Sequence, residues 1–227
     1  MRVTVIAAAG RLGRVVVDEA LLRGHEVTGL ARQPDRVTDV CRERTDSSTG
    51  SGPGVAVDRL TLVAGDARDG DAVRRAVAGA DAVISTVSGG SRTDPHRAAE
   101  ATLSLVRALQ SEGVRRLVLT SAYPIVARRP VLVMALLRRT FATAYADAAR
   151  AEEVVRGSAL DWTIVRLNRL VDGPPVGPPT LAAAAVPPRS LTRVDTARLL
   201  LDLAEGQEWV SAAVNVGGAR RRGRVGA

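Results

Sequence analysis

The chain contains no lysine, because all 32 of its Lys and Arg residues are arginine. This absence excludes a Schiff-base lysine, the lysine of a Walker-type phosphate loop and a Tyr/Lys catalytic pair, whatever the fold. Aromatic residues make up only 2% of the 227 residues. A surface of aromatic rings on which single-stranded nucleic acid could stack is therefore close to excluded.

Cysteine is nearly absent as well, since Cys41 is the only one, and this excludes an internal disulfide and a cysteine-rich metal site. His25 and His96 have no carboxylate or Cys partner nearby in the sequence, so we expect no metal site. The longest apolar run, Val131–Leu137, is too short to cross a membrane, and no signal-peptide pattern precedes the first apolar segment. We therefore predict a cytoplasmic protein without membrane attachment.

The net charge of +8 is concentrated at one end of the chain. Four arginines and no acid lie within residues 218–227, so residues 1–217 carry 8 − 4 = +4. This mild excess is not typical of a nucleic-acid-binding surface. Residues 218–227 are predicted to form a basic, disordered tail.

Apolar segments alternate in the way that a parallel sheet with crossover helices requires. Arg2–Ala8 is a short continuous apolar run, typical of a strand buried on both faces. Arg11–Arg23 has helical apolar spacing and is closed by Gly24, and Glu26–Ala31 resembles a second strand. Together they form a β-α-β unit of about 30 residues, which implies parallel strands and a right-handed crossover.

The same alternation continues along the chain. Further strands are predicted at Arg59–Ala64, Ala80–Val87, Val114–Ser121, Asp161–Leu167 and Ala212–Val216. Helices are predicted at Asp35–Arg44, Asp71–Val77, Thr93–Glu112, in a long stretch ending near Gly157, and at Asp195–Ala204. The helix Thr93–Glu112 is expected to be capped by Thr93 or Asp94, and a loop is predicted at Thr45–Gly54. Residues 1–217 are thus predicted to form a single α/β domain, a Rossmann-like doubly wound parallel sheet with helices on both faces. The Pro/Gly/Ala-rich region of about residues 168–190 is predicted to cover the substrate.

The turn between the first strand and the first helix is the most informative motif. Unpaired amides that open a helix attract a pyrophosphate, Gly10 allows close approach of the backbone, and Gly13 allows the helix to pack against the sheet. The turn resembles the G-x-x-G-x-x-G of the extended, atypical short-chain dehydrogenase/reductase group, which includes NmrA-like proteins and flavin/biliverdin reductases. Ala7 replaces the first glycine, and its Cβ narrows the turn. Two readings stay open: a turn that holds a diphosphate through Ala7, Gly10, Arg11, Leu12 and Gly13, or a turn that binds no dinucleotide.

The end of the second strand indicates which cofactor is used. An acid there would accept a hydrogen bond from a free ribose 2′-hydroxyl, but the chain has Arg32, whose guanidinium suits a 2′-phosphate. This favours NADP (NADPH) over NAD, with an exposed Arg32 that has no ligand as the alternative. By resemblance, Asp66 and Ala67 after the third strand meet the adenine, and Thr86 and Val87 after the fourth lie under the nicotinamide ribose.

The usual proton relay of short-chain dehydrogenases is missing. Tyr145 is the only candidate tyrosine on the helix after the fifth strand, and Ala149 stands where the group has its lysine. An unassisted phenol with a pKa of about 10 is a poor base at neutral pH. Ser121 and Tyr123 match the serine-bearing strand end of the reductase group, where either hydroxyl would contact a substrate carbonyl or the cofactor's carboxamide. Ser121 as a purely structural hydroxyl is the alternative.

A second family pattern lies further along the chain. Glu152 and Glu153, followed by a strand that includes Arg166, resemble the group's helix with a Glu pair that leads to a strand ending in Arg-Pro. Leu167 and Asn168 replace the proline here, so the chain departs from the group in the loop that shapes the substrate pocket.

The resemblance implies an NADPH-dependent reductase that acts on a small conjugated or apolar molecule without a Tyr/Lys pair, because flavin and biliverdin reductases also lack that lysine. The acceptor then takes its proton from solvent. Two alternatives remain: a redox-inactive family member that catalyses a cyclisation, isomerisation or elimination, and an NADP-binding redox sensor. We expect a small-molecule substrate, no nucleic-acid partner, and a monomer or homodimer.

Overall fold

The computed structural model describes residues 1–37, 57–127 and 131–219. The strands are β1 (Arg2–Ile6), β2 (Glu26–Ala31), β3 (Leu60–Ala64), β4 (Ala82–Ser85), β5 (Arg116–Ala122), β6 (Asp161–Leu167), β7 (Leu170–Val171), β8 (Thr180–Ala182), β9 (Leu191–Thr192) and β10 (Ala212–Gly217). The α-helices are α1 (Arg11–Leu22), α3 (Gly70–Val77), α4 (Arg97–Ser111), α5 (Val131–Thr140), α6 (Ala142–Arg156) and α7 (Arg193–Glu205), and 3-10 turns lie at Val57–Arg59 and Tyr123–Ile125.

The central sheet has eight strands in the order β3-β2-β1-β4-β5-β6-β10-β8. In this spatial order, the first seven strands are mutually parallel, and the last strand, β8, pairs antiparallel with β10. β7 and β9 form a separate parallel pair. The predicted parallel α/β fold is therefore confirmed, with one correction: the region of about residues 168–190, for which the sequence predicts a covering loop, contains the strands β7 and β8.

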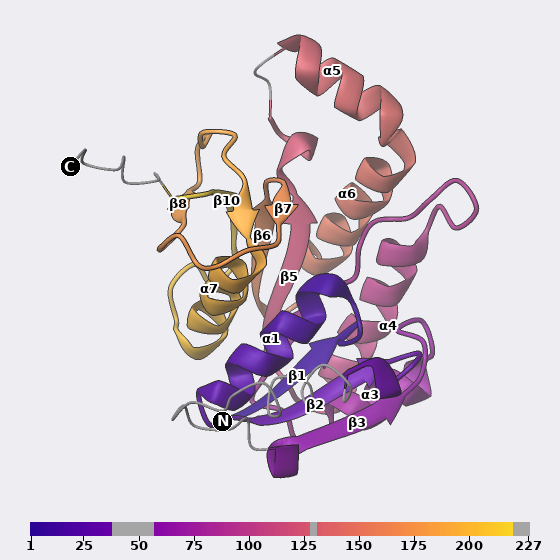
Figure 1. Cartoon of the computed structure of the whole chain (residues 1–227). Helices are drawn as coiled ribbons and strands as arrows, with labels where there is room; N and C mark the ends of the chain where they lie inside the picture. The colour runs from indigo at the N-terminus through magenta and orange to yellow at the C-terminus, as the bar shows by residue number, and fades with distance from the viewer. Residues whose placement is uncertain (38–56, 128–130, 220–227) are drawn as a thin grey trace, which may run out of the picture.

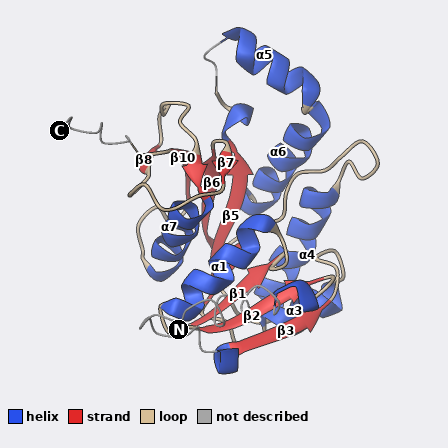
Figure 2. Ribbon diagram, viewed as in Figure 1, coloured by secondary structure: helices blue, strands red, loops and turns tan. Residues whose placement is uncertain are grey.

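Helices cover both faces of the sheet, as Figures 1 and 2 show. Helices α1 and α7 pack in one apolar cluster on one face, and α3, α4 and α6 pack in another on the opposite face. Strand β1 contributes to both, because Val5 belongs to the first cluster and Ile6 to the second, and both are buried. This two-sided burial explains why the strands have continuous apolar sequences.

Two strands are shorter than their apolar runs predicted. β1 ends at Ile6 rather than Ala8, because Ala7 adopts a φ of 63°, which no strand residue can hold. β4 ends at Ser85, and the next residue, Thr86, turns its hydroxyl back onto the Ile6 carbonyl oxygen at 3.0 Å. The two adjacent strands therefore end together, and their turns face the same edge of the sheet.

Helix α4 begins later than predicted. His96 is its N-terminal flanking residue, so the prediction of Thr93 or Asp94 as the cap was wrong. The Asp94 carboxylate accepts a hydrogen bond from Arg97 Nε at 3.0 Å instead, and the first amides of α4 are bonded by a side chain from another helix, described below. A side chain distant in the sequence therefore takes the role of the local cap at the start of α4, and no local sequence motif predicts such a contact.

The helical stretch before Gly157 is broken into two helices, α5 and α6, at Phe141. Helix α5 projects from the body of the molecule, at the top of Figure 1, and exposes Leu132 (85%) and Leu136 (65%). Leu137 packs against a small cluster that includes Tyr123 and Val186.

Predictions for residues 38–44 of the second helix, for the loop 45–54 and for most of the basic tail lie outside the described residues. Within the described ranges, no helix is long and apolar enough to span a membrane, and no group of His, Cys, Asp and Glu side chains is arranged to bind a metal ion.

Candidate functional site

A cavity of about 550 Å³ opens at the carboxyl edge of the sheet, where the strand order reverses between β1 and β4. Open parallel sheets bind ligands at this position. Of the ten residues predicted to bind the cofactor, seven line the cavity: Ala7, Gly10, Arg32, Asp66, Ala67, Thr86 and Val87. The other three, Arg11, Leu12 and Gly13, form the first turn of α1 beside it.

The turn into α1 leaves the first helical amides available to a ligand. Gly10 is the N-terminal flanking residue, no side chain caps the helix, and its first turn holds no acid. The Gly10 amide donates to the Ala7 carbonyl oxygen at 2.9 Å, which closes the turn. The positive end of the helix dipole therefore faces the cavity, and neither a side-chain cap nor an acid of the first helical turn offsets it.

Ala7 occupies the position at which the group has a glycine, and it takes the backbone conformation that a glycine would take. Its φ of 63° lies in the left-handed region, where a Cβ causes strain of about 1–2 kcal/mol. The turn thus keeps its shape despite the substitution.

Gly13 is required by packing within the turn. A Cβ at Gly13 would lie 2.4 Å from the Ala7 carbonyl oxygen and 3.0 Å from Thr86 Oγ1. Gly65, after β3, is equally confined, since a Cβ there would lie 2.4 Å from the Ala72 Cβ. Both glycines let helices approach the carboxyl edge closely, and the tight packing at Gly65 was not foreseen from the sequence.

The lining of the cavity is positively charged. Four arginines line it against one acid: Arg32, Arg36, Arg68 and Arg97 against Asp66. Arg32 and Arg36 are exposed and form no hydrogen bond or ion pair with another described residue. Arg32 was predicted from the sequence, whereas Arg36, four residues later and lining the same cavity, was not.

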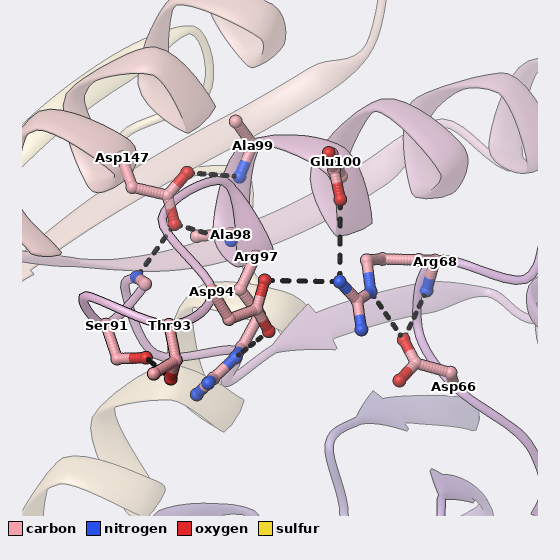
Figure 3. A network of polar contacts seen from close by, with 11 residues as sticks. Asp66, Arg68, Ser91, Thr93, Asp94, Arg97, Ala98, Ala99, Glu100 and Asp147 are labelled. Atoms are coloured by element: carbon pink, nitrogen blue, oxygen red, sulfur yellow. Dashed lines mark hydrogen bonds and ion pairs between the residues drawn. The ribbon is translucent and has the colours of Figure 1, made fainter. Parts of the chain in front are cut away.

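The other two arginines are already engaged, as Figure 3 shows. Arg68 contacts Asp66, Asp94 and Glu100, and Arg97 donates to Asp94. Burial acts to raise the pKa of Asp66, but hydrogen bonds from Arg68 outweigh it and hold the pKa below its ordinary value. The charge of Arg32 also helps to lower the pKa of Asp66, but neither Arg32 nor Arg36 forms a hydrogen bond or ion pair with a described residue, so both can bind an anion.

A buried carboxylate holds the loop between β4 and α4, whose first residues line the cavity. Asp147, on α6, is fully buried and accepts hydrogen bonds from the amides of Gly90 (2.8 Å), Ala98 (2.7 Å) and Ala99 (3.0 Å) (Figure 3). It thereby caps α4 from outside and holds the loop that connects β4 to α4. Since this loop begins with the cavity-lining Thr86, Asp147 contributes to the shape of the site, and no sequence motif identified it.

Ser121 lies at the carboxyl end of β5, outside the cavity lining but at the same edge of the sheet. Its Oγ donates to Glu152 Oε1 at 2.7 Å, and Arg166 donates to both oxygens of that carboxylate, with Nε at 2.9 Å from Oε1. Burial acts to raise the pKa of Glu152, but the hydrogen bonds from Arg166 and Ser121 outweigh it and lower the pKa below its ordinary value. All three residues belong to motifs noted in the sequence, but their contact could not be predicted from it.

The two candidate tyrosines do not line the cavity. The buried Tyr123 hydroxyl donates to the Val186 carbonyl oxygen at 3.3 Å and accepts from the Val186 amide at 3.2 Å. It ties the segment 172–188 to β5, and the expected contact with a substrate carbonyl has no support in this geometry. Tyr145 is half-buried, and burial raises its pKa above the ordinary value. Its phenol therefore stays protonated at neutral pH, and its predicted catalytic role remains a prediction.

The segment predicted to cover the substrate is tied to the turn between β1 and α1. The Asp172 carboxylate accepts from Arg11, the first residue of α1, at 2.8 Å and also from Arg193 of α7. These ion pairs hold the start of the segment beside the turn, and covering of a substrate by residues 168–190 remains a prediction.

A second cavity of about 640 Å³ lies between α7 and the proline-rich segment, and it includes Pro175, Pro178, Leu199 and Trp209. None of the predicted catalytic or cofactor-binding residues lines it, but the region of about residues 168–190, predicted to cover the substrate, supplies Pro175 and Pro178 to its lining. Of the two cavities, the first alone is lined by predicted cofactor-binding residues.

The fold and the first cavity define a protein of the dinucleotide-binding Rossmann class. Residues 7–207 match a family model described as NAD(P)H-binding, and the chain belongs to this family.

Solved structures share the fold along nearly the whole chain. A short-chain dehydrogenase/reductase of the wide type from Veillonella parvula, in complex with NADP, is 21% identical with a TM-score of 0.76, covering 97% of this chain and 95% of that one. An anaerobillin reductase from Escherichia coli O157:H7 is 20% identical with a TM-score of 0.75, covering 97% and 98%.

Curated relatives match by sequence over about half of this chain. Cinnamoyl-CoA reductase 1 from Oryza sativa is 35% identical over 131 residues, which are 56% of this chain and 36% of that protein. The chain spans between 12% and 36% of the length of such relatives.

Proposed function

We propose that this protein is an NADPH-dependent reductase that acts on a small conjugated or apolar molecule. The observation that carries the proposal is the cavity where the strand order reverses between β1 and β4. It combines the N-terminus of α1, which no side chain caps, with Arg32, which forms no ion pair with a described residue. The first attracts a diphosphate, and the second attracts a ribose 2′-phosphate. Membership of the NAD(P)H-binding family supports the same interpretation.

The order of the strands suggests how the dinucleotide lies. Its adenosine end is expected at β2 and β3, near Arg32 and Asp66, and its diphosphate at the turn after β1, near Gly10. Its second ribose is expected at the end of β4, near Thr86. The nicotinamide then reaches the carboxyl end of β5, because ligands in this fold follow the carboxyl edge across the switch point.

NADP is favoured over NAD by the charge balance at the end of β2. Arg32 and Arg36 line the cavity without a hydrogen-bond or ion-pair partner among the described residues, and the residue directly after β2 is Arg32 rather than an acid that would bond a free 2′-hydroxyl. A guanidinium bonds a phosphate with two parallel N–H groups, whereas it gains little from a hydroxyl.

When bound, NADPH supplies a hydride, which carries two electrons to a conjugated acceptor. The acceptor takes the matching proton from solvent, so a Tyr/Lys pair is not needed. The contribution of the chain is then to bind and orient the reactants. This fits a chain without lysine, whose Tyr123 hydroxyl is held by Val186.

Calorimetric titration with NADPH, NADP⁺ and NADH tests the binding, and NADPH oxidation with quinones and flavins as acceptors tests the activity. We expect NADPH to bind more tightly than NADH and at least one acceptor to support turnover. Absence of heat with all three nucleotides at millimolar concentration would overturn the proposal. Binding without turnover would favour a redox-inactive enzyme or a sensor.

A further inference from the structure

Glu152 is a charged side chain buried at the carboxyl edge of the sheet, with only 4% of its surface exposed. Two residues from neighbouring strands converge on it, since Ser121 and Arg166 stand opposite each other in the register of β5 and β6. A buried carboxylate requires such partners to remain ionised. The arrangement therefore fixes the positions of all three side chains.

The distances also fix the position of the serine proton. Ser121 Oγ and Glu152 Oε1 lie 2.7 Å apart, and two oxygen atoms approach so closely only with a proton between them. Because Arg166 bonds both carboxylate oxygens, Glu152 is ionised and can only accept. The proton therefore belongs to Ser121, whose hydroxyl has only lone pairs left for any other group.

Ser121 lies where the far end of a dinucleotide would arrive. Ser85, the last residue of β4, stands opposite Leu119 of β5, so Ser121 lies two residues further toward the carboxyl edge. The cavity extends from Arg32 at β2 to Ser88 after β4, and β5 is the next strand in the sheet. Although Ser121 is not part of the cavity lining, a group that continues beyond the second ribose along this edge is expected to reach it.

We propose that Ser121, held as a hydrogen-bond acceptor by Glu152 and Arg166, receives an N–H of the nicotinamide carboxamide. Glu152 is the positioning residue, because its carboxylate accepts the one hydrogen bond that the Ser121 hydroxyl can donate. This inference rests on the proposed function. It replaces the alternative in which Ser121 donates to a substrate carbonyl, since a hydroxyl that already donates cannot polarise a second oxygen.

The test compares two oxidised cofactors that differ only at the carboxamide. In the 3-acetylpyridine analogue of NADP⁺ a methyl group replaces the NH₂, and the carbonyl is retained. By calorimetry on the full chain we expect NADP⁺ to bind about threefold to tenfold more tightly than the analogue, the range of one net hydrogen bond. In Ser121→Ala the ratio of the two dissociation constants should fall to about one, and in Ser121→Thr it should persist because the hydroxyl is kept.

Matched variants separate this effect from general disturbance of the strand. Thr120→Val removes the neighbouring hydroxyl, which donates to the Ser85 carbonyl oxygen, and should keep the ratio. Glu152→Gln should lower the ratio, whereas Glu153→Gln, which removes an exposed acid beside it, should not. Binding of 2′,5′-ADP, which contacts only the adenosine end of the site, reports whether each variant is folded.

Equal binding of both cofactors by the unmodified chain would overturn the inference and leave the proposed function intact. The same holds if Ser121→Ala keeps the ratio while it still binds 2′,5′-ADP. If neither cofactor binds the unmodified chain, the inference and the proposed function both fail. Should Glu152→Gln not fold, the two Ser121 variants still decide the matter.

Discussion

Replacement of Arg32 by alanine is the most direct test of the cofactor assignment. Arg32 is exposed at the end of β2 and lines the cavity, and no described residue forms an ion pair with it. The substitution removes one positive charge without leaving a buried partner unpaired. Its effect on binding therefore reports the ligand rather than the fold.

The magnitude follows from the exposure of the side chain. Because Arg32 is in contact with solvent, the dielectric of water applies, and two unit charges 4 Å apart attract by about 1 kcal/mol. A phosphate monoester carries about −1.5 to −2 charges. The loss is then about 2 kcal/mol, which is about a thirtyfold increase in the Kd of NADPH. NADH, which has no 2′-phosphate, should change by no more than about threefold, within the usual scatter of surface substitutions.

Titration calorimetry with both nucleotides at two salt concentrations measures this difference. Higher salt should reduce the effect, because the interaction lies at the surface. Arg75→Ala is the matched control, since Arg75 is an exposed arginine on α3 that does not line the cavity. Equal losses for NADPH and NADH, or the same loss in Arg75→Ala, would refute the assignment of Arg32 to the 2′-phosphate.

Three further predictions concern the turn and the buried acid. Ala7→Gly should raise Tm by about 2 °C, because it relieves left-handed strain beyond the entropy that glycine adds to the unfolded chain; a lower Tm would contradict the strain argument. Gly13→Ala should destabilise the fold by about 1–3 kcal/mol in denaturant titrations and weaken NADPH binding, whereas Gly70→Ala, where a Cβ meets nothing within 4 Å, should do neither. The folded-state pKa of Glu152 is depressed, so the stability it contributes is complete above the unfolded value near 4.5 and is lost as pH falls through the folded pKa. Glu152→Gln should therefore flatten the fall in unfolding free energy at acid pH, and an unchanged slope would contradict the ion pair with Arg166.

The sequence was sufficient to predict the architecture, because each strand and helix is defined by the apolar pattern within its own short segment. Continuous apolar runs such as Arg2–Ile6 mark strands buried on both faces, and helical spacing in Arg11–Leu22 marks a crossover. The glycine-rich turn between them and Arg32 after β2 placed the candidate site at the carboxyl edge. Chain order alone puts these residues near one another, since consecutive parallel strands end at the same edge.

Partners distant in the chain could not be predicted, because no periodicity connects them. Ser121 and Glu152 lie 31 positions apart, and Asp147 lies 57 positions from the Gly90 amide that it binds. The antiparallel β8 within a proline-rich segment is of the same kind, since it forms only because β10 offers it an edge.

The sequence by itself determined the parallel α/β fold, the glycine-containing turn that opens the first helix and the arginine that follows β2. Only the tertiary structure decided that Tyr123 bonds the Val186 backbone and that Ser121 donates its proton to Glu152. The physical reason is that a residue's type limits which hydrogen bonds it can form, whereas the packing of remote segments selects which of them it does form.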